Sequence, residues 1–301
     1  MAGRPLTNVG SNTAAFGPSE WALMLTLGFI WGSAFLWIAI AVDHLAPGVV
    51  AFGRVVLGGA ALAVFPGARR RIDRADWGRL AAIGLIGNAA PALLFAVAET
   101  ELDSAVAGML TSGTPLFSLL IAGMMLRSIP GRAQIAGIAI GFGGIVLMTL
   151  PSLRGAEAAP LEVALVLLAV VCYGINGNLV VPLQQRYGGP AVVAWALAIS
   201  SVALLPLGIA GMSESDFAAS SLIALVILGV IGTGIARTLS ATLAGRGGAP
   251  RMSTTSYLIP IVALALGAAF RDEVIHPIGI LGVAVALTGA WIATRAVRAT
   301  H

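Results

Sequence analysis

Two arginines are the side chains of this sequence whose positions point most directly to chemistry. Arg54 and Arg237 each interrupt a long apolar segment. An arginine near the centre of a membrane helix costs roughly 2.5–3.5 kcal/mol on insertion scales, so it normally faces a cavity or a partner. Arg54 therefore either anchors the carboxylate of a solute or has a structural role, reaching the outer headgroups or backbone carbonyls. Arg237 either shares the anchor or marks the cytoplasmic side.

Small polar residues recur along one apolar segment at helical spacing. Ser104, Gly108, Thr111, Pro115 and Ser118 follow one another every three or four residues, the period of one helix face. Such a face, with a proline inside the helix, permits either close helix packing or freed carbonyls that line a cavity. The sequence leaves both open. A similar face occurs later in the chain, at Ser253, Ser256 and Pro260.

Asparagine and aromatic side chains complete a candidate binding site. In lipid, an asparagine must find its hydrogen-bond partners in another helix or in a wet cavity, and an aromatic ring either walls a cavity or simply packs. We predict that the following residues bind substrate: Trp31, Phe35, Arg54, Asn88, Phe95, Thr111, Thr114, Tyr173, Asn176, Trp195, Arg237 and Ser256.

Catalytic and metal-binding patterns are missing from the sequence. Glu99, Glu101, Asp103 and Glu273 fall at the ends of apolar segments, where we expect solvated loops. Without an ionisable relay inside a segment, facilitated diffusion or exchange is favoured over proton-driven transport. An intramembrane protease would need a Ser/His dyad, two aspartates or metal ligands. The GTGIAR stretch (232–237) lacks the strand of a dinucleotide loop. We therefore predict no enzyme, catalytic residue, metal or cofactor.

The elements that carry these residues are too apolar for a soluble fold. Of the 301 residues 58% are hydrophobic and 10% charged, whereas soluble domains have about 25% charged residues. The net charge of +4 comes from arginines in short segments between apolar runs, which indicates membrane topology and no nucleic-acid partner. The single cysteine, Cys172, lies in an apolar run and forms no intramolecular disulfide.

A membrane-spanning helix needs about 20 apolar residues, and the chain offers ten such segments. Most arginines fall on one side when the N-terminus is cytoplasmic, so we predict both termini inside a cytoplasmic (inner) membrane protein. The predicted spans are 21–42, 48–66, 79–98, 104–126, 133–150, 161–182, 190–211, 219–241, 251–270 and 277–295.

The second half of the chain repeats the first. Because each half holds five spans, an odd number, the second half would enter the membrane from the opposite side; the alternative is chance matching of Gly and Pro. The predicted fold is therefore an all-α integral membrane protein of ten transmembrane helices in two inverted five-helix repeats. We expect a disordered tail (1–19), the two repeats (20–150 and 151–296) and a C-terminal tail (297–301). The matched pairs are Thr111 and Ser256, Pro115 and Pro260, Gly137 and Gly282, Gly144 and Gly289, and Trp31-Gly32 and Tyr173-Gly174.

The order of these motifs resembles the EamA-type transporters of the drug/metabolite transporter superfamily. Two features depart from the family pattern, because Ser128 stands where the first copy would have Glu, and Ala196-Leu197 where Arg54 would recur. The resemblance rests on GFIWGSAFLWIA (28–39), Arg54, MLTSGTPLF (109–117), TTSYLIPIV (254–262) and FRDEVIHPIGILGVAVALTGAWI (270–292).

The resemblance implies a secondary transporter that exports small metabolites, amino acids first among them, by alternating access. An Arg54 anchor with hydroxyl and Asn donors suits a zwitterionic or anionic solute. Export of a nucleobase, a sugar or a cationic drug, and a channel-like pore, are the alternatives. The expected partners are the solute and membrane lipid. The glycine-rich fifth and tenth helices form either a homodimer face or a tight contact within one molecule.

Overall fold

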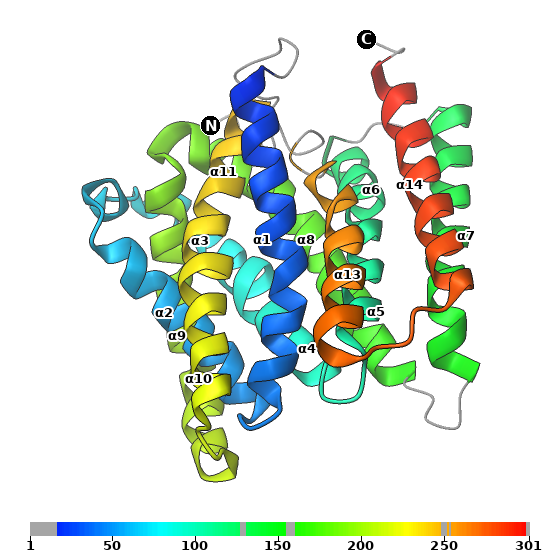
Figure 1. Ribbon diagram of the computed structural model, residues 1–301. Helices are drawn as coiled ribbons and strands as arrows, with labels where there is room; N and C mark the ends of the chain where they lie inside the picture. Colours follow the sequence, from blue (N-terminus) through cyan, green and yellow to red (C-terminus); the bar gives the residue numbers. More distant parts are fainter. Residues whose placement is uncertain (1–16, 127–130, 155–159, 248–251, 253, 299–301) are drawn as a thin grey trace.

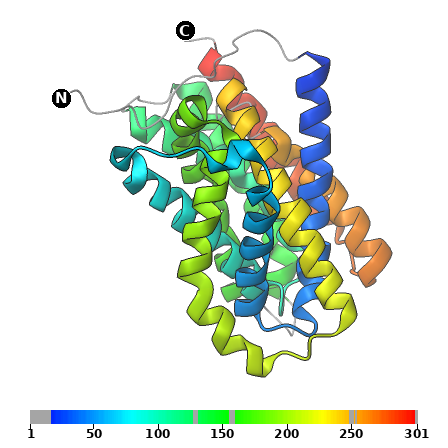
Figure 2. The same cartoon turned by 90° about the vertical axis from the view of Figure 1, so that its left-hand side faces the viewer.

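A computed structural model describes residues 17–126, 131–154, 160–247, 252 and 254–298, and within these ranges all regular structure is helical. The helices pack side by side in one bundle, and the start of α1 and the end of α14 lie at the same end of it (Figures 1 and 2). In the described part of the chain, seven helices are long and apolar enough to cross a membrane, and three shorter apolar helices accompany them. That all ten predicted segments cross the bilayer stays a prediction.

The helix bounds follow the predicted spans closely, with differences at the termini. Residues 1–16 of the predicted tail lie outside the described residues, and α1 already begins at Pro18 because Pro suits the first helical turn. At the other end α14 continues to Arg298, and 299–301 are not described. The main helices are α1 (Pro18–Val42), α2 (Pro47–Ala63), α3 (Trp77–Gly84), α4 (Ala90–Ala98), α5 (Ser104–Leu110), α6 (Thr114–Leu126), α7 (Arg132–Arg154), α8 (Pro160–Tyr187), α9 (Gly189–Ala210), α10 (Ala219–Ile227), α11 (Ala236–Gly247), α13 (Ile259–Arg271) and α14 (Pro277–Arg298).

Short segments of other helical geometry join several of these helices. The 3-10 segments are η1 (Pro66–Arg69), η2 (Arg74–Asp76), η4 (Thr111–Gly113), η5 (Gly211–Glu214) and η7 (Thr254–Tyr257). The π segments are η3 (Leu85–Ala89) and η6 (Leu228–Ile235).

The outer surface of the bundle is apolar. Met124, Val202 and Ile261 are each more than half exposed, as are many other large hydrophobic side chains on the helices. Exposing so much apolar surface to water is unfavourable, whereas lipid chains in a bilayer are themselves apolar and cover it. The protein is therefore a multi-pass membrane protein, as its composition predicts.

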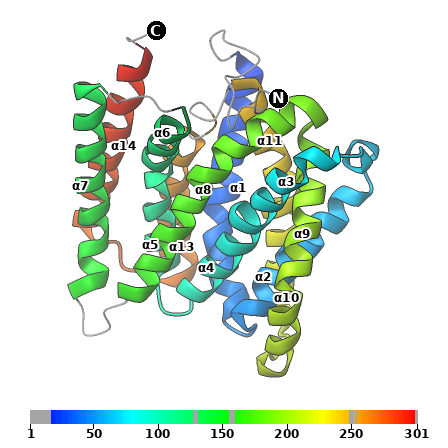
Figure 3. The ribbon, with the colours of Figure 1, turned by 180° about the vertical axis from the view of Figure 1, so that it is seen from behind.

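Proline breaks two helices next to the polar residues singled out above. Pro115 and Pro260 cannot donate the helical hydrogen bond to the carbonyl four residues earlier, which belongs to Thr111 and Ser256 respectively. The chain forms the 3-10 segments η4 and η7 at these places instead of one continuous α-helix. The carbonyl oxygen of Thr111 accepts the hydroxyl of Thr114 instead, at 2.7 Å. These breaks lie in the part of the bundle where α5 and α13 pack together (Figure 3).

Two other helices contain a π segment, which the sequence patterns did not predict. In η3 the Nδ2 of Asn88 donates to the carbonyl oxygen of Ile83 at 2.9 Å. In η6 the hydroxyl of Thr233 donates to the carbonyl oxygen of Leu228, also at 2.9 Å. Each bond joins a side chain to the carbonyl oxygen five residues earlier. In the wider π turn the side chain thus replaces the backbone N–H that an α-helix would supply to that carbonyl.

Glycines bring α7 and α14 together within one molecule. A Cβ on Gly144 would lie 2.6 Å from the carbonyl oxygen of Gly282, and one on Gly289 would lie 2.5 Å from that of Gly137. Only glycine permits so close an approach of the two backbones. These glycines therefore make an intramolecular contact, one of the two alternatives that the sequence left open.

Candidate functional site

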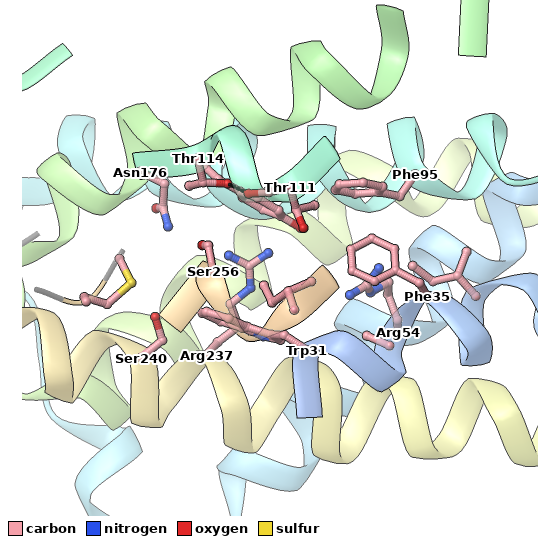
Figure 4. Close-up of a pocket in the computed structure, with 15 residues that line it drawn as sticks. Trp31, Phe35, Arg54, Phe95, Thr111, Thr114, Asn176, Arg237, Ser240 and Ser256 are labelled. Carbon is pink, nitrogen blue, oxygen red and sulfur yellow. Dashed lines mark hydrogen bonds between the residues drawn. The ribbon is translucent and has the colours of Figure 1, made fainter. Parts of the chain in front are cut away.

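A cavity of about 70 Å³, partly open to solvent, lies inside the bundle. Helices from both halves of the chain contribute to its walls. In the view of Figure 4, Phe95, Thr111 and Thr114 lie along one wall, Trp31 and Ser240 along the other, and the guanidinium of Arg237 between them. The lining residues are Trp31, Ala34, Phe35, Ile38, Arg54, Phe95, Thr111, Thr114, Tyr173, Asn176, Arg237, Ser240, Met252, Ser256 and Ile259.

Arg54 enters this cavity from α2 and is held by the side chain of Thr233. The residue is 5% exposed, and its Nε donates to the hydroxyl oxygen of Thr233 in η6 at 3.1 Å. The close contact of α2 with η6 is made by glycine, since a Cβ on Gly58 would lie 2.9 Å from the carbonyl oxygen of Gly229. Arg54 therefore does not reach the outer headgroups, and its guanidinium is directed at the cavity.

Arg237 reaches the same cavity from α11. Its guanidinium carbon lies 4.7 Å from the ring centroid of Tyr173 and 6.0 Å from that of Trp31. Both contacts are within cation–π range. The buried Nε of Arg237 has no hydrogen-bond partner among the described residues. Arg237 therefore lines the cavity, where the rings of Tyr173 and Trp31 contact its charge, and its role as a solute anchor stays a prediction.

Aromatic rings form a continuous apolar wall beside the two arginines. The rings of Phe35 and Phe95 meet edge to face, with centroids 5.4 Å apart. Phe95 also stacks on Tyr173 at 5.8 Å. Such pairs are rigid and add about 0.5–1.5 kcal/mol each to the area that they bury. The wall can accept an apolar portion of a solute while the arginines bind its charged portion.

Two threonine hydroxyls of the cavity have committed their protons and present acceptors. The hydroxyls of Thr111 and Thr114 donate to the carbonyl oxygens of Gly108 and Thr111, at 2.6 and 2.7 Å. Their hydroxyl oxygens remain able to accept. The Oδ1 of Asn176 is buried and has no hydrogen-bond partner among the described residues. That oxygen lies against Gly87 of the neighbouring helix, so the hydroxyl oxygens of Thr111 and Thr114 are the acceptors that suit a positively charged donor such as an ammonium group.

Among the predicted site residues, all except Asn88 and Trp195 line this cavity. Asn88 is buried in η3, where its Nδ2 bonds to the backbone. The Nε1 of Trp195 donates to the carbonyl oxygen of Arg70 at 3.1 Å, and its ring meets that of Trp77 at a separate surface groove. The contacts that the structure gives these two residues are therefore structural. Ser253, the predicted counterpart of Gly108, lies outside the described residues.

Several residues of the site were missed from the sequence. Ser240 adds a hydroxyl to the cavity, and Ile38 and Met252 add apolar surface. Thr233 does not line the cavity but holds Arg54. It lies in the GTGIAR stretch, and its position in an apolar helix is the one sequence signal that could have identified it.

Thr233→Val tests whether Thr233 positions Arg54. Valine keeps the size of threonine but loses the acceptor for Nε of Arg54, a hydrogen bond with a net value of about 0.5–1.5 kcal/mol. We expect the apparent affinity for the transported solute to fall roughly twofold to tenfold. Thr233→Ser retains the hydroxyl and should bind like the wild type. Equal affinities of the valine and serine variants would contradict this positioning role.

The apolar exterior and the internal charged cavity are typical of a helical membrane transporter. The EamA-like transporter family model matches the chain twice, over residues 19–150 and 160–295. The protein belongs to the EamA-like transporter family.

Curated relatives match nearly the full length of the chain. A probable terminal-alkyne amino-acid exporter of Streptantibioticus cattleyicolor is 29% identical over 281 residues, which cover 91% of this chain and 93% of the relative. A probable amino-acid metabolite efflux pump of Escherichia coli (strain K12) is 24% identical, with coverage of 90% and 93%. One solved crystal structure superposes with a TM-score of 0.67 at 20% identity, covering 94% of this chain and 99% of that one, which shows the same fold.

Proposed function

We propose that this protein exports amino acids, or closely related carboxylate-bearing metabolites, across the cytoplasmic membrane by alternating access. The observation that carries the proposal is the charge of the cavity. Its described lining includes the guanidinium groups of Arg54 and Arg237 and no carboxylate. A site inside the bundle with this charge favours an anionic group over a cationic one, because opposite charges attract more strongly there than in bulk water.

The remaining lining residues match the other parts of an amino acid. The hydroxyl oxygens of Thr111 and Thr114 suit the ammonium group, and the wall of Phe35 and Phe95 suits an apolar side chain. A cationic drug would meet two like charges and is disfavoured. A sugar or a nucleobase would leave both arginines without a counter-charge. The names of two relatives, a probable amino-acid exporter and a probable amino-acid metabolite efflux pump, support the same assignment.

An inverted repeat would supply the two halves that alternate. Reciprocal contacts support it: Gly32 packs against Val262, and Gly174 packs against Phe117. Val262 follows Phe117 at the same sequence offset by which Ser256 follows Thr111. The glycine contacts between α7 and α14 are also reciprocal. Repeats related by a two-fold axis in the membrane plane place the solute site between them, and the cavity takes side chains from both halves.

Cysteine labelling tests the orientation of these repeats. Single cysteines at the exposed positions of Arg70 and Arg246, in a Cys172→Ala background, should both be labelled only from the cytoplasm. A cysteine at exposed Glu101 should be labelled only from outside. Labelling of the first two positions from opposite sides would contradict the inverted arrangement and, with it, alternating access between two antisymmetric halves.

Flux into proteoliposomes tests the transport function. Purified protein should mediate uptake of radiolabelled L-leucine and other neutral amino acids, and unlabelled substrate inside the vesicles should accelerate it by counterflow. Vesicles without protein are the control. Protein-dependent movement of sugars, nucleobases or cationic drugs, with none of amino acids, would contradict the assigned substrate class. Single-channel currents would indicate the channel-like alternative instead of a carrier.

A further inference from the structure

A carboxyl group that the proposed function does not use is buried beside the cavity. Glu99 follows the last residue of α4, and its backbone N–H donates to the carbonyl oxygen of Phe95, which lines the cavity, at 2.9 Å. Its side chain was expected in a solvated loop, yet the residue is only 6% exposed. Neither carboxyl oxygen has a hydrogen-bond partner among the described residues. The expectation of a solvated Glu99 is therefore wrong, because the turn after α4 folds against the bundle core.

The surroundings of Glu99 decide its protonation state. An ionised carboxylate that is buried without donors costs several kcal/mol, so the neutral form is favoured instead. Burial raises the pKa of the Glu99 carboxyl well above its usual range. Arg54 and Arg271 attract its negative charge, and Glu273 repels it. Glu101 and Asp103 follow on the same turn and are exposed.

Of the two arginines that attract the charge of Glu99, Arg271 is already paired with another carboxylate and Arg54 is not. Arg271 binds Asp43 through both terminal nitrogens, at 2.6 and 3.0 Å. Glu273 accepts hydrogen bonds from the N–H and the hydroxyl of Ser104, at 2.9 and 2.7 Å. By contrast, the bond of Arg54 is to a neutral hydroxyl.

The other groups that act on Arg54 face it from two further helices. The hydroxyl-bearing ring of Tyr173 lies on α8, and the positive charge of Arg237 lies on α11. Arg54 therefore interacts both with the charge of buried Glu99 and with a cavity that holds a second positive charge.

We propose that Glu99 is a proton-binding site linked to the solute site, so that its carboxyl takes up a proton from water when a solute carboxylate binds Arg54. The inference rests on the proposed function, because it requires a carboxylate solute. The positive charge of Arg54 is what stabilises ionised Glu99. A solute carboxylate cancels that stabilisation, so the proton and the solute favour each other's binding by the same factor.

This linkage has a defined direction with pH. At low pH, where Glu99 of the unliganded protein is already protonated, solute affinity does not depend on pH. As pH rises above the pKa of the unliganded protein, binding must also supply a proton to Glu99, and affinity falls by up to about tenfold per pH unit. The fall ends above the pKa of the solute complex.

Isothermal titration calorimetry of detergent-solubilised protein with L-leucine tests the proposal, because the charges of that solute do not change from mildly acidic to mildly alkaline pH. The wild type should lose affinity with rising pH and take up as much as one proton, seen as different binding enthalpies in buffers of different ionisation enthalpy. Glu99→Gln is neutral at every pH and should keep the acid-side affinity without proton uptake. Glu101→Gln, at an exposed position of the same turn, should behave like the wild type.

The outcomes separate the two proposals. Wild-type protein that binds L-leucine without taking up protons at any pH overturns the linkage, even if the Glu99→Gln variant cannot be purified. A Glu99→Gln variant that retains the wild-type pH dependence overturns it as well. Protein that binds neither L-leucine nor any other neutral amino acid contradicts the proposed function itself, and the linkage with it.

Discussion

Arg54→Gln is expected to reduce the apparent affinity for amino acids by about tenfold to hundredfold. Glutamine removes the charge of Arg54 from the cavity, and charge-assisted hydrogen bonds contribute about 1.5–3 kcal/mol each. The variant should still fold, because burying a neutral amide costs less desolvation free energy than burying a guanidinium. The measurement is the concentration dependence of L-leucine uptake into proteoliposomes that contain equal amounts of protein.

Two further variants make this prediction specific. Arg54→Lys keeps the positive charge but loses the planar, two-pronged donor, so an intermediate loss is expected. Arg74→Gln removes an exposed arginine outside the cavity and should leave uptake unchanged. Unaltered uptake by Arg54→Gln would show that Arg54 does not bind the solute, and a structural role of Arg54 would then remain.

Gly144→Leu is expected to lower the free energy of unfolding more than any other substitution named above. A Cβ at this position would lie 2.3 Å from the backbone nitrogen of Ala286 and 2.6 Å from the carbonyl oxygen of Gly282. Neither backbone atom can move without separating α7 from α14. Overpacking costs about 1–3 kcal/mol where side chains can adjust, so a clash with backbone should cost at least that much. The midpoint of thermal unfolding in detergent should fall clearly.

The neighbouring glycine provides the matched control. A Cβ on Gly143 meets no heavy atom within 4 Å, so Gly143→Ala should unfold at the wild-type temperature or slightly above it, given the better helix propensity of alanine. If Gly144→Leu were as stable as Gly143→Ala, the close intramolecular contact of α7 with α14 would be wrong. The dimer interpretation of these glycines would then regain support.

Much of the candidate site could be predicted because polar residues are conspicuous in apolar segments. Four of the predicted site residues are polar side chains in otherwise apolar segments, and each lines the cavity: Arg54, Arg237, Thr111 and Asn176. Residue type and spacing do not separate these residues from Asn88, which is also a polar side chain in an apolar segment. Asn88 bonds to its own helix in a π segment, and the choice between a wider helical turn and a cavity is not visible in residue spacing.

Burial was the property that local patterns predicted least well. Glu99 and Glu101 are two residues apart at the end of one apolar segment, yet Glu99 is buried and Glu101 is exposed. Likewise, Thr233 became part of the site only through α2, which is distant in sequence and brings Arg54 against it.

The sequence by itself determined that this chain is a membrane protein and where most of its helices lie, because both depend on the length and composition of contiguous segments. Its proline and glycine positions also determined where helices can break or touch. The tertiary structure alone decided which polar groups share one cavity, which carboxyl group is buried without a partner, and that α7 and α14 meet within one molecule. These depend on how helix faces from distant parts of the chain pack together, which no local pattern of residues specifies.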